Sequence, residues 1–226
     1  MKQKIYAVYG VGGFAREILP LVRDEVGKDE NSQIYFVVDE EYLPKTKELN
    51  SIEIISFNDF LQIRADEKFL TVGFSNLQRR IEVFEFCKNN NIHILNVKAT
   101  NAVIMNNVQI DNGYILSPFT TLTSNIKIGV GFQANLYSYV AHDCMIGNFV
   151  TFAPGVKCNG HVEIGNNVYV GSGVIIHPGK AGKPLKIGHN SVIAAGSVVT
   201  KNIPNGMKVF GNPAIEFTKE NIKRRM

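Results

Sequence analysis

Three features are scarce in this sequence: long apolar runs, cysteine, and an excess of charge of one sign. No apolar run reaches the roughly 18 residues that a transmembrane helix needs. The first residues, MKQKIYAVYG, lead directly into a strand-like segment and lack the apolar core and small-residue cleavage site of a signal peptide. We therefore expect a cytoplasmic protein without membrane insertion.

The three cysteines, Cys87, Cys144 and Cys158, are well separated and odd in number. They exclude a disulfide framework and a four-cysteine metal site, so we expect buried thiols. The net charge of +4 is small and dispersed, apart from a basic tail. That tail contains Lys219, Lys223, Arg224 and Arg225. Charge alone therefore does not predict nucleic-acid binding.

Glycine is scarce in the first 100 residues, which hold 5 of the 20 glycines, whereas the remainder holds 15. This unequal use indicates two structural plans in one chain. A content of 45% apolar and 19% charged residues excludes a mainly disordered protein. We expect a first domain over residues 1–99, a second over residues 100–213, and a tail over residues 214–226.

The first domain opens with a strand-like run, Ile5 to Tyr9, followed by a glycine turn and a helical pattern interrupted by Pro20. We expect Pro20 to kink or end that helix. Further strand-like runs cover residues 34–38, 69–73 and 92–97. Alternating strands and helices predict a parallel sheet, here a Rossmann-like α/β half-domain.

The glycine turn allows two interpretations. Gly10, Gly12 and Ala15 match the spacing of dinucleotide-binding turns, which place a phosphate at a helix start. Asp39, however, follows Gly10 by 29 residues rather than about 20, and fewer than 100 residues cannot hold both halves of a dinucleotide fold. We predict one nucleotide half. The alternative, that the glycines only permit tight packing of strand and helix, stays open.

The second domain contains a six-residue period. Thirteen successive positions at this step, from Ile104 to Ile176, are all apolar. We call these thirteen apolar residues anchors. Three units of six residues make one triangular turn, which predicts a parallel β-helix prism in which each anchor stacks on the anchor 18 residues further along the chain. An antiparallel sandwich would need turn signals at intervals of roughly 8 to 12 residues, and these are absent.

The period is interrupted once. One step of six after Ile176 would place the next anchor at residue 182, but the period resumes only at Ile187, five residues later. Five extra residues within 177–186 must therefore leave the prism as a loop, where binding residues are often carried. We expect the prism to end near Ile203 and Pro204, with a turn over 211–214 leading to the tail.

These repeats resemble the hexapeptide signature of left-handed β-helix acyltransferases, and the turn at 10–15 with GFSN at 73–76 resembles their sugar-acetylating branch. That branch includes the 4-amino-sugar N-acetyltransferases of bacillosamine, perosamine and viosamine pathways and the sialic-acid O-acetyltransferases. The resemblance covers residues 3–215. It implies acetyl-CoA as donor, no metal, a homotrimer, and a place in polysaccharide biosynthesis.

The activity implied is N-acetylation of the C4 amine of a nucleotide-linked dideoxy amino sugar, with UDP expected as the nucleotide. Acetylation of a hydroxyl, as in the sialic-acid enzymes, is the alternative. A non-catalytic nucleotide-sugar protein with a decayed site is a third interpretation, against which the retained His142 and Asp143 argue.

Acetyl transfer to an amine needs a base, a donor to the oxyanion and a groove for the thioester. Histidine suits the base near neutral pH, and His142-Asp143 interrupts a hexapeptide corner. The resemblance implies His142 as general base and Asp143 as the group that orients it. Because 142 plus 18 is 160, Gly160 stacks over His142, and its N–H is a candidate oxyanion donor.

The resemblance also implies the binding residues. For the nucleotide sugar these are Gly12, Gly13, Phe14, Asp39, Glu40, Gly73, Asn76 and Asn135. For acetyl-CoA they are Thr151, Gly155, Gly173, Ala195, Lys201, Lys208 and Pro213. Phe14 and Thr151 stand where close relatives often have a histidine. His161, His177 and His189 lack metal-ligand spacing, so we expect no metal.

Overall fold

The computed structural model describes residues 3–27 and 31–224. Residues 1–2, 28–30 and 225–226 lie outside this description, and with them Arg225 of the expected basic tail. The chain divides into two compact units, Met1–Val97 and Lys98–Met226. Among the helices described, none is long and apolar enough to cross a membrane.

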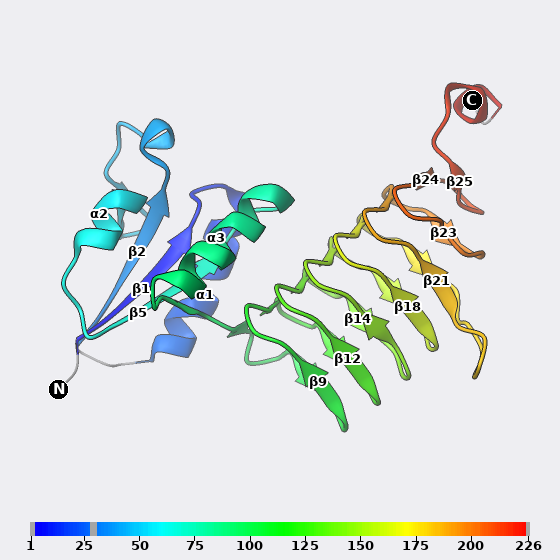
Figure 1. The fold of residues 1–226 in the computed structure, drawn as a ribbon, viewed down its shortest axis with the longest axis horizontal. Coiled ribbons are helices and arrows are strands. Elements are labelled where there is room, and N and C mark those ends of the chain that lie inside the picture. The colour runs from blue at the N-terminus through cyan, green and yellow to red at the C-terminus, as the bar shows by residue number, and fades with distance from the viewer. Residues whose placement is uncertain (1–2, 28–30, 225–226) are drawn as a thin grey trace. The chain divides into compact units, whose positions relative to one another are not determined.

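The first unit is a six-stranded sheet with helices, in the order β3-β4-β2-β1-β5-β6 (Figure 1). β1 lies between β2 and β5 and is parallel to both, as the alternating pattern predicted. Its elements are β1 (Lys4–Tyr9), α1 (Gly13–Val26), β2 (Ser32–Val38), η1 (Glu40–Tyr42), β3 (Glu48–Leu49), β4 (Ile52–Ser56), α2 (Phe57–Gln62), β5 (Glu67–Val72), α3 (Leu77–Asn89) and β6 (His93–Ile94).

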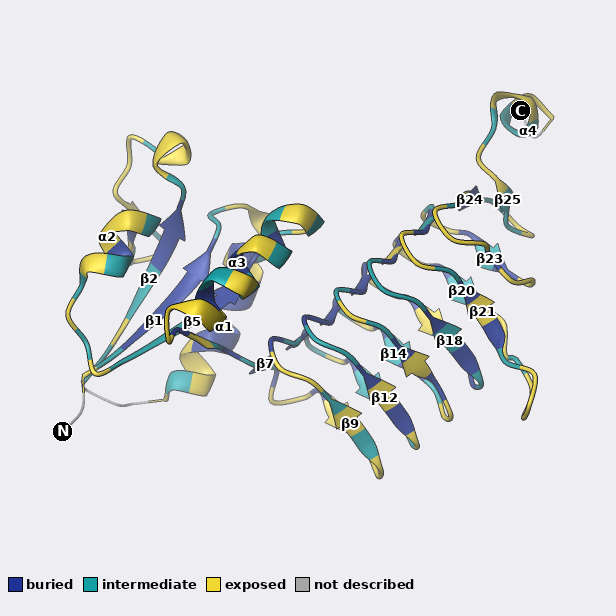
Figure 2. Ribbon diagram, viewed as in Figure 1, coloured by how far each residue is buried: buried dark blue, intermediate teal, exposed yellow. Residues whose placement is uncertain are grey.

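Burial in the core accounts for the apolar residues of β1 and of one face of α1. All residues from Ile5 to Tyr9 are buried, as expected of a central parallel strand covered on both faces (Figure 2). Helix α1 continues through Pro20 as far as Val26, so the expectation that the helix ends at the proline is wrong. Its buried residues form one face: Ala15, Ile18, Leu19, Leu21 and Val22.

The strand expected over residues 92–97 is two strands. β6 (His93–Ile94) pairs with β5 of the first unit, whereas β7 (Val97–Lys98) belongs to a sheet of the second. Leu95 still donates its N–H to the carbonyl of Leu70. The apolar run therefore crosses from one unit to the other.

The second unit is a parallel β-helix with three sheets. The eight-stranded sheet contains β7, β10 (Ile115–Leu116), β13 (Gln133–Ala134), β16 (Thr151–Phe152), β19 (Tyr169–Val170), β22 (Val192–Ile193), β24 (Lys208–Phe210) and β25 (Ile215–Glu216). The six-stranded sheet contains β8 (Val103–Ile104), β11 (Thr121–Leu122), β14 (Tyr139–Val140), β17 (Lys157–Cys158), β20 (Ile175–Ile176) and β23 (Val198–Val199). The five-stranded sheet contains β9 (Val108–Ile110), β12 (Ile126–Ile128), β15 (Met145–Ile146), β18 (Val162–Ile164) and β21 (Leu185–Ile187).

The anchors stack as the six-residue period predicted. Leu122 pairs with Val140, and Val140 pairs with Cys158, so each partner lies one full turn of the prism further along the chain. From Leu116 to Ile176 every anchor is buried. Ile104 is 37% exposed, because β8 is the edge strand of its sheet.

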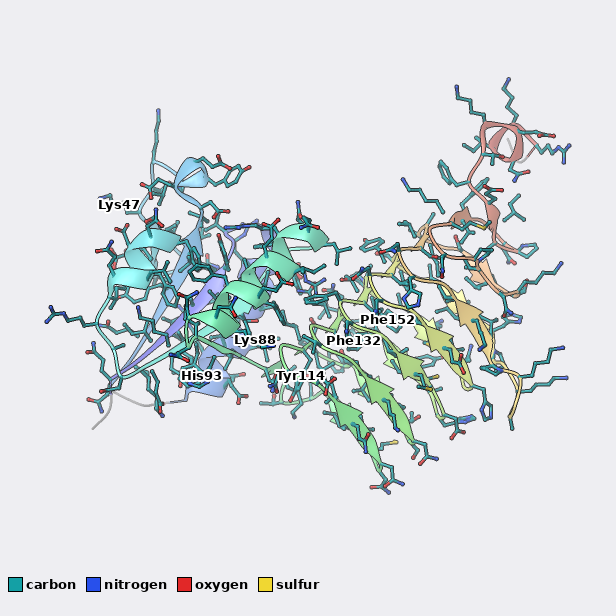
Figure 3. The ribbon with its side chains drawn as sticks, viewed as in Figure 1. Lys47, Lys88, His93, Tyr114, Phe132 and Phe152 are labelled. Carbon is teal, nitrogen blue, oxygen red and sulfur yellow. The ribbon has the colours of Figure 1, made fainter. Side chains whose placement is uncertain are left out.

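A second inward position, which the sequence analysis missed, lies four residues after the anchors from Leu116 to Val170. Its residues are all buried: Thr120, Ile126, Phe132, Ser138, Cys144, Val150, Val156, Val162, Val168 and Val174. Inside the prism the ring of Phe132 meets that of the anchor Phe152 edge-on, 5.3 Å between centroids (Figure 3). In this part of the prism each unit of six therefore buries two side chains. Cys87, Cys144 and Cys158 are free and buried, as expected.

The small residue that often follows an anchor has a packing reason. A Cβ on Gly147 would lie 2.4 Å from Oδ1 of Asn166 on the next coil. That oxygen accepts the N–H of Asn148 at 2.9 Å. One coil higher, Nδ1 of His189 accepts the N–H of Asn166 at 2.9 Å. His189 is therefore a structural residue of this corner.

The corners themselves are columns of residues with positive φ. The first column, called here the Asp143 column, contains Asn107, Asn125, Asp143 and His161, with φ of 57°, 55°, 58° and 55°. Another, the Gly155 column, contains Phe119, Tyr137, Gly155, Gly173 and Gly196. Glycine and asparagine tolerate this left-handed conformation, which explains their frequency in the second half of the chain.

The interruption of the period lies where the sequence placed it. Ile164 pairs with Ile187, five positions later than one regular turn would place its partner, and the extra segment is closed by a bridge between Lys180 and Lys183. The expectation that the prism ends near Ile203 is wrong. β24 adds to β22 in parallel, and Val209 is 3% exposed, so one more strand continues the apolar stack. β25 and the short helix α4 (Lys219–Lys223) follow.

Candidate active site

His142 and Asp143 occupy the corner between β14 and β15. Nδ1 of His142 lies 2.7 Å from Oδ2 of Asp143, and the two side chains are 57% and 39% exposed. The pKa of the Asp143 carboxyl lies below its ordinary value, chiefly because of this hydrogen bond and further because of Asn125 and His161. An ionised carboxylate accepts the Nδ1 proton and leaves Nε2 of a neutral imidazole free to take another.

Gly160 lies against the His142 ring, as the 18-residue step predicted. A Cβ built on Gly160 would be 2.5 Å from Cε1 and 2.6 Å from Nε2 of His142, so only glycine leaves room for the ring in this position. Among the residues described, no acceptor takes the Gly160 N–H. The chain thus places a free backbone donor beside the candidate base.

His161 joins this group, and the sequence analysis missed it. Its Nε2 lies 3.7 Å from Oδ2 of Asp143, and its ring stands perpendicular to that of His142 with centroids 5.2 Å apart. The available signal was the same arithmetic that found Gly160, because 143 plus 18 is 161. The ligand atoms of these three side chains lie within 4.8 Å of one another, a donor set that could also hold a cation.

The expected acetyl-CoA residues lie elsewhere on the prism. Gly155 and Gly173 follow each other in the Gly155 column, with φ of 73° and 68°, and Ala195 precedes Gly196 of the same column. Gly155 and Gly160 stand at opposite ends of β17, so one chain does not bring the two sets together. The other expected residues are Thr151, which is 6% exposed on β16, and Lys201, Lys208 and Pro213, which are exposed.

A hollow of about 740 Å³ follows the outer face of the five-stranded sheet, beginning next to this corner. Met145, three residues after His142, lines it and is 55% exposed. Lys186 and Glu163 form an ion pair of 2.9 Å along it. His142 itself is not part of its lining.

The first unit has a pocket of about 860 Å³ at the carboxyl ends of β1 and β2. Of the residues expected at the nucleotide sugar, Asp39, Glu40 and Asn76 line it. The remaining four residues of this unit, Gly12, Gly13, Phe14 and Gly73, are not in the lining.

Gly10 and Gly73 differ in their relation to this pocket. At the turn, Gly10 lines the pocket and has a φ of 115°, which other residues rarely adopt. Gly73 is a packing glycine, because a Cβ there would lie 2.7 Å from Cα of Ala15. The packing interpretation concerned the glycines of the turn, and there a Cβ on Gly12 or Gly13 would meet no atom within 4 Å, so close packing does not explain those two.

Arg79 and Tyr9 are pocket residues that the sequence analysis missed. Nη2 of Arg79 donates to the Tyr9 hydroxyl at 2.7 Å and pairs with Asp39, and the Tyr9 hydroxyl also donates to Asp39. Burial and the bond to Asp39 raise the pKa of Tyr9. Asp39 is thus neutralised by Arg79, whereas Glu40 is exposed. Asn76 caps α3, its Oδ1 accepting the Arg79 N–H at 3.0 Å.

Many known proteins are similar to the chain, and three of them are described below, while no family model matches it. The chain is 40% identical over 215 residues to the GDP-perosamine N-acetyltransferase of Escherichia coli O157:H7, covering 95% of this chain and 97% of that protein. WeeI from Acinetobacter baumannii AYE is 43% identical, with a TM-score of 0.90 over 95% of this chain and all of that one.

The third relative is the acetyltransferase domain of PglB from Neisseria gonorrhoeae FA1090, solved with acetyl coenzyme A. It is 21% identical with a TM-score of 0.82, covers 96% of this chain and 100% of that one, and shows the fold. The expected left-handed β-helix with an N-terminal α/β region is confirmed. The chain belongs to the hexapeptide-repeat family of sugar acetyltransferases, and it is an acetyltransferase.

Proposed function

We propose that this protein transfers the acetyl group of acetyl-CoA to the C4 amine of a nucleotide-linked dideoxy amino sugar, with His142 as general base. The observation that carries the proposal is the His142–Asp143 pair lying against a free Gly160 N–H. The name of the Escherichia coli relative and the acetyl coenzyme A bound by the PglB domain support it. We propose the cytoplasm as its location.

The proposed reaction is a direct attack within one ternary complex. Nε2 of His142 takes a proton from the amine while the amine nitrogen forms a bond to the thioester carbonyl carbon. Asp143 stabilises the resulting imidazolium, and the Gly160 N–H donates to the oxygen that becomes negative. The carbon–sulfur bond then breaks, and His142 returns its proton to the departing sulfur.

For the nucleotide we propose GDP in place of the UDP expected from the sequence. The relative that is 40% identical over nearly the whole chain is named for a GDP-linked sugar. The pocket of the first unit offers the exposed carboxylate of Glu40, an acceptor that suits the N1–H and 2-amino groups of guanine.

The direct test is a panel of GDP-, UDP- and dTDP-linked 4-amino sugars incubated with acetyl-CoA, with thiol release measured for each. We expect the GDP-linked amine to give the highest kcat/KM. Release with a hydroxyl acceptor and none with any amine would support the O-acetyltransferase alternative. Failure to bind acetyl-CoA in calorimetry would support a non-catalytic protein.

Arg79 provides a prediction about the pocket. Arg79→Ala removes the cation that neutralises Asp39 and adjoins Tyr9, so we expect KM for the nucleotide sugar to rise about tenfold, with KM for acetyl-CoA unchanged. Steady-state kinetics with each substrate varied in turn measures both. Gln78→Ala, on the adjacent position of α3 and outside the pocket lining, is the control. Equal KM values in all three proteins would contradict the assignment.

We further propose a homotrimer. His142 and Gly160 stand at a different corner from Gly155 and Gly173, so a pantetheine groove that includes both sets needs corners from two chains. Light scattering after size exclusion should give about three times the chain mass of 25.1 kDa. A monomer that is fully active would overturn this proposal.

A further inference from the structure

The Asp143 column is joined by side-chain contacts from coil to coil. Nδ2 of Asn107 donates to Oδ1 of Asn125 at 3.3 Å, and Nδ2 of Asn125 donates to Oδ1 of Asp143 at 3.2 Å. All three residues share the same left-handed backbone conformation. The column therefore forms a ladder of amides that ends on the carboxylate beside His142.

This ladder gives the two oxygens of Asp143 different partners. Oδ1 accepts from Asn125, whereas Oδ2 lies 2.7 Å from Nδ1 of His142 and 3.7 Å from Nε2 of His161. Among the residues described, the titratable groups that face the carboxylate are these two imidazoles and the buried thiol of Cys144, which the charge of Asp143 also reaches. A carboxylate on an exposed corner, held at one oxygen only, can rotate away from its partner. The bond from Asn125 removes that freedom.

We propose that Asn125 is a positioning residue for the acetyl transfer: by holding Oδ1 of Asp143, it directs Oδ2 to Nδ1 of His142 and keeps Nε2 free to accept the amine proton. This inference rests on the proposed function of His142. Asn125 touches no reacting atom and acts through Asp143.

The carboxylate at its end distinguishes the Asp143 column, because an amide bond also joins Asn167 to Asn190 at 3.0 Å at another corner with positive φ. The Gly155 column shows that a corner with the same positive φ needs no side-chain bonds, since Gly155, Gly173 and Gly196 fill it. The Asp143 column instead changes from amide to carboxylate at the coil that carries His142. Asn125 also contributes to the lowered pKa of Asp143, after the larger contribution of His142.

Asn107 provides a matched control. It lies one coil below Asn125, with a similar φ and a similar amide bond, but its partner is Asn125 rather than Asp143. Glycine adopts positive φ freely, so Asn125→Gly and Asn107→Gly each remove one amide without strain at the corner.

The first experiment compares kcat and KM of the two glycine variants with wild type. We expect Asn125→Gly to lower kcat about tenfold, because His142 is less well oriented, and to leave KM for both substrates within about twofold. Asn107→Gly should stay within about twofold of wild type in every constant. Asn125→Asp places a second negative charge near the imidazole, which stabilises the imidazolium and should move the acid limb of the kcat/KM profile to higher pH.

A second measurement is independent of turnover. Protein labelled with ¹⁵N in its five histidines reports the tautomer of each ring by NMR, with His142 assigned from the His142→Ala variant. We expect wild-type His142 to be protonated at Nδ1, as in Asn107→Gly, and Asn125→Gly to show a mixture of tautomers.

The outcomes separate the two claims. If Asn125→Gly matches wild type in kcat and in tautomer, whereas His142→Ala is inactive, the positioning role is overturned and the proposed function stands. If His142→Ala keeps wild-type turnover, the proposed function fails first, whatever Asn125 does. A tenfold loss in Asn107→Gly as well would show that the ladder acts on corner stability, and would also overturn the proposal.

Discussion

His142→Ala is expected to lower kcat by about 100-fold or more with an amino-sugar acceptor, since it removes the group that takes the amine proton. The ring is 57% exposed and contacts the corner through Asp143, His161 and Gly160, so its loss should not affect folding. Steady-state thiol release measures the effect, and thermal unfolding checks the fold. Unchanged turnover in a well-folded variant would remove His142 from the mechanism.

The pH dependence follows from the same pair. The pKa of Asp143 lies below its ordinary value, so its carboxylate stays ionised above that lowered pKa and loses the His142 bond only as pH falls through it. The hydrogen bond that orients His142 is therefore lost only at a pH below the ordinary pKa of an aspartate. Asp143→Asn removes the carboxylate at every pH, so it should reduce kcat while preserving the fold. A kcat equal to that of wild type in Asp143→Asn would contradict the role of the pair.

Gly160→Ala is the second large effect expected. Its methyl group would lie 2.5 Å from the His142 ring. The ring must move toward solvent, because the two coils are held together by the bond from the His161 N–H to the His142 carbonyl at 3.0 Å. A displacement of this size is expected to lower kcat about 100-fold, while the exposed ring can move without unfolding the coil. The backbone N–H remains, so the variant tests the position of His142 more than the oxyanion donor.

A double variant distinguishes these two roles. If the methyl group acts only by displacing the ring, Gly160→Ala in a His142→Ala background should cause no further loss of kcat. An additional loss in that background would show that the oxyanion donor also depends on the geometry at residue 160. Full activity of Gly160→Ala alone would contradict the close packing of ring and glycine.

The period of the sequence predicted the second unit in detail, because in a prism a residue number also gives a position in space. The step of 18 residues predicted that Gly160 lies against His142. The same step relates Asp143 to His161, but the sequence analysis did not draw that second pairing. The second inward position went unnoticed because Thr120 and Ser138 interrupt its apolar character. The five inserted residues were located because Ile187 resumes the period.

No such period exists in the first unit, and there the residue roles were less predictable. Tyr9 and Arg79 meet across 70 residues of sequence, a contact that only the pairing of β1 and β5 and the start of α3 brings about. The sequence analysis expected Gly12 and Gly13 of the glycine turn to bind the phosphate, whereas the glycine of this turn that lines the pocket is Gly10. The run at 92–97 carries no glycine or proline to mark where one sheet ends and another begins.

The hairpin between Lys180 and Lys183 has a practical consequence. The coil still bonds to its neighbours at His177 and Gly179, whose N–H groups donate to the carbonyls of Val199 and Gly160, and it returns at Leu185, whose N–H donates to the carbonyl of His161. Only the residues between Gly179 and Leu185 leave the stack, so the pairings of β18 with β21 and of β20 with β23 do not depend on what lies there. The tip of this hairpin is thus a permissive site for grafting a peptide tag or a fluorophore attachment point.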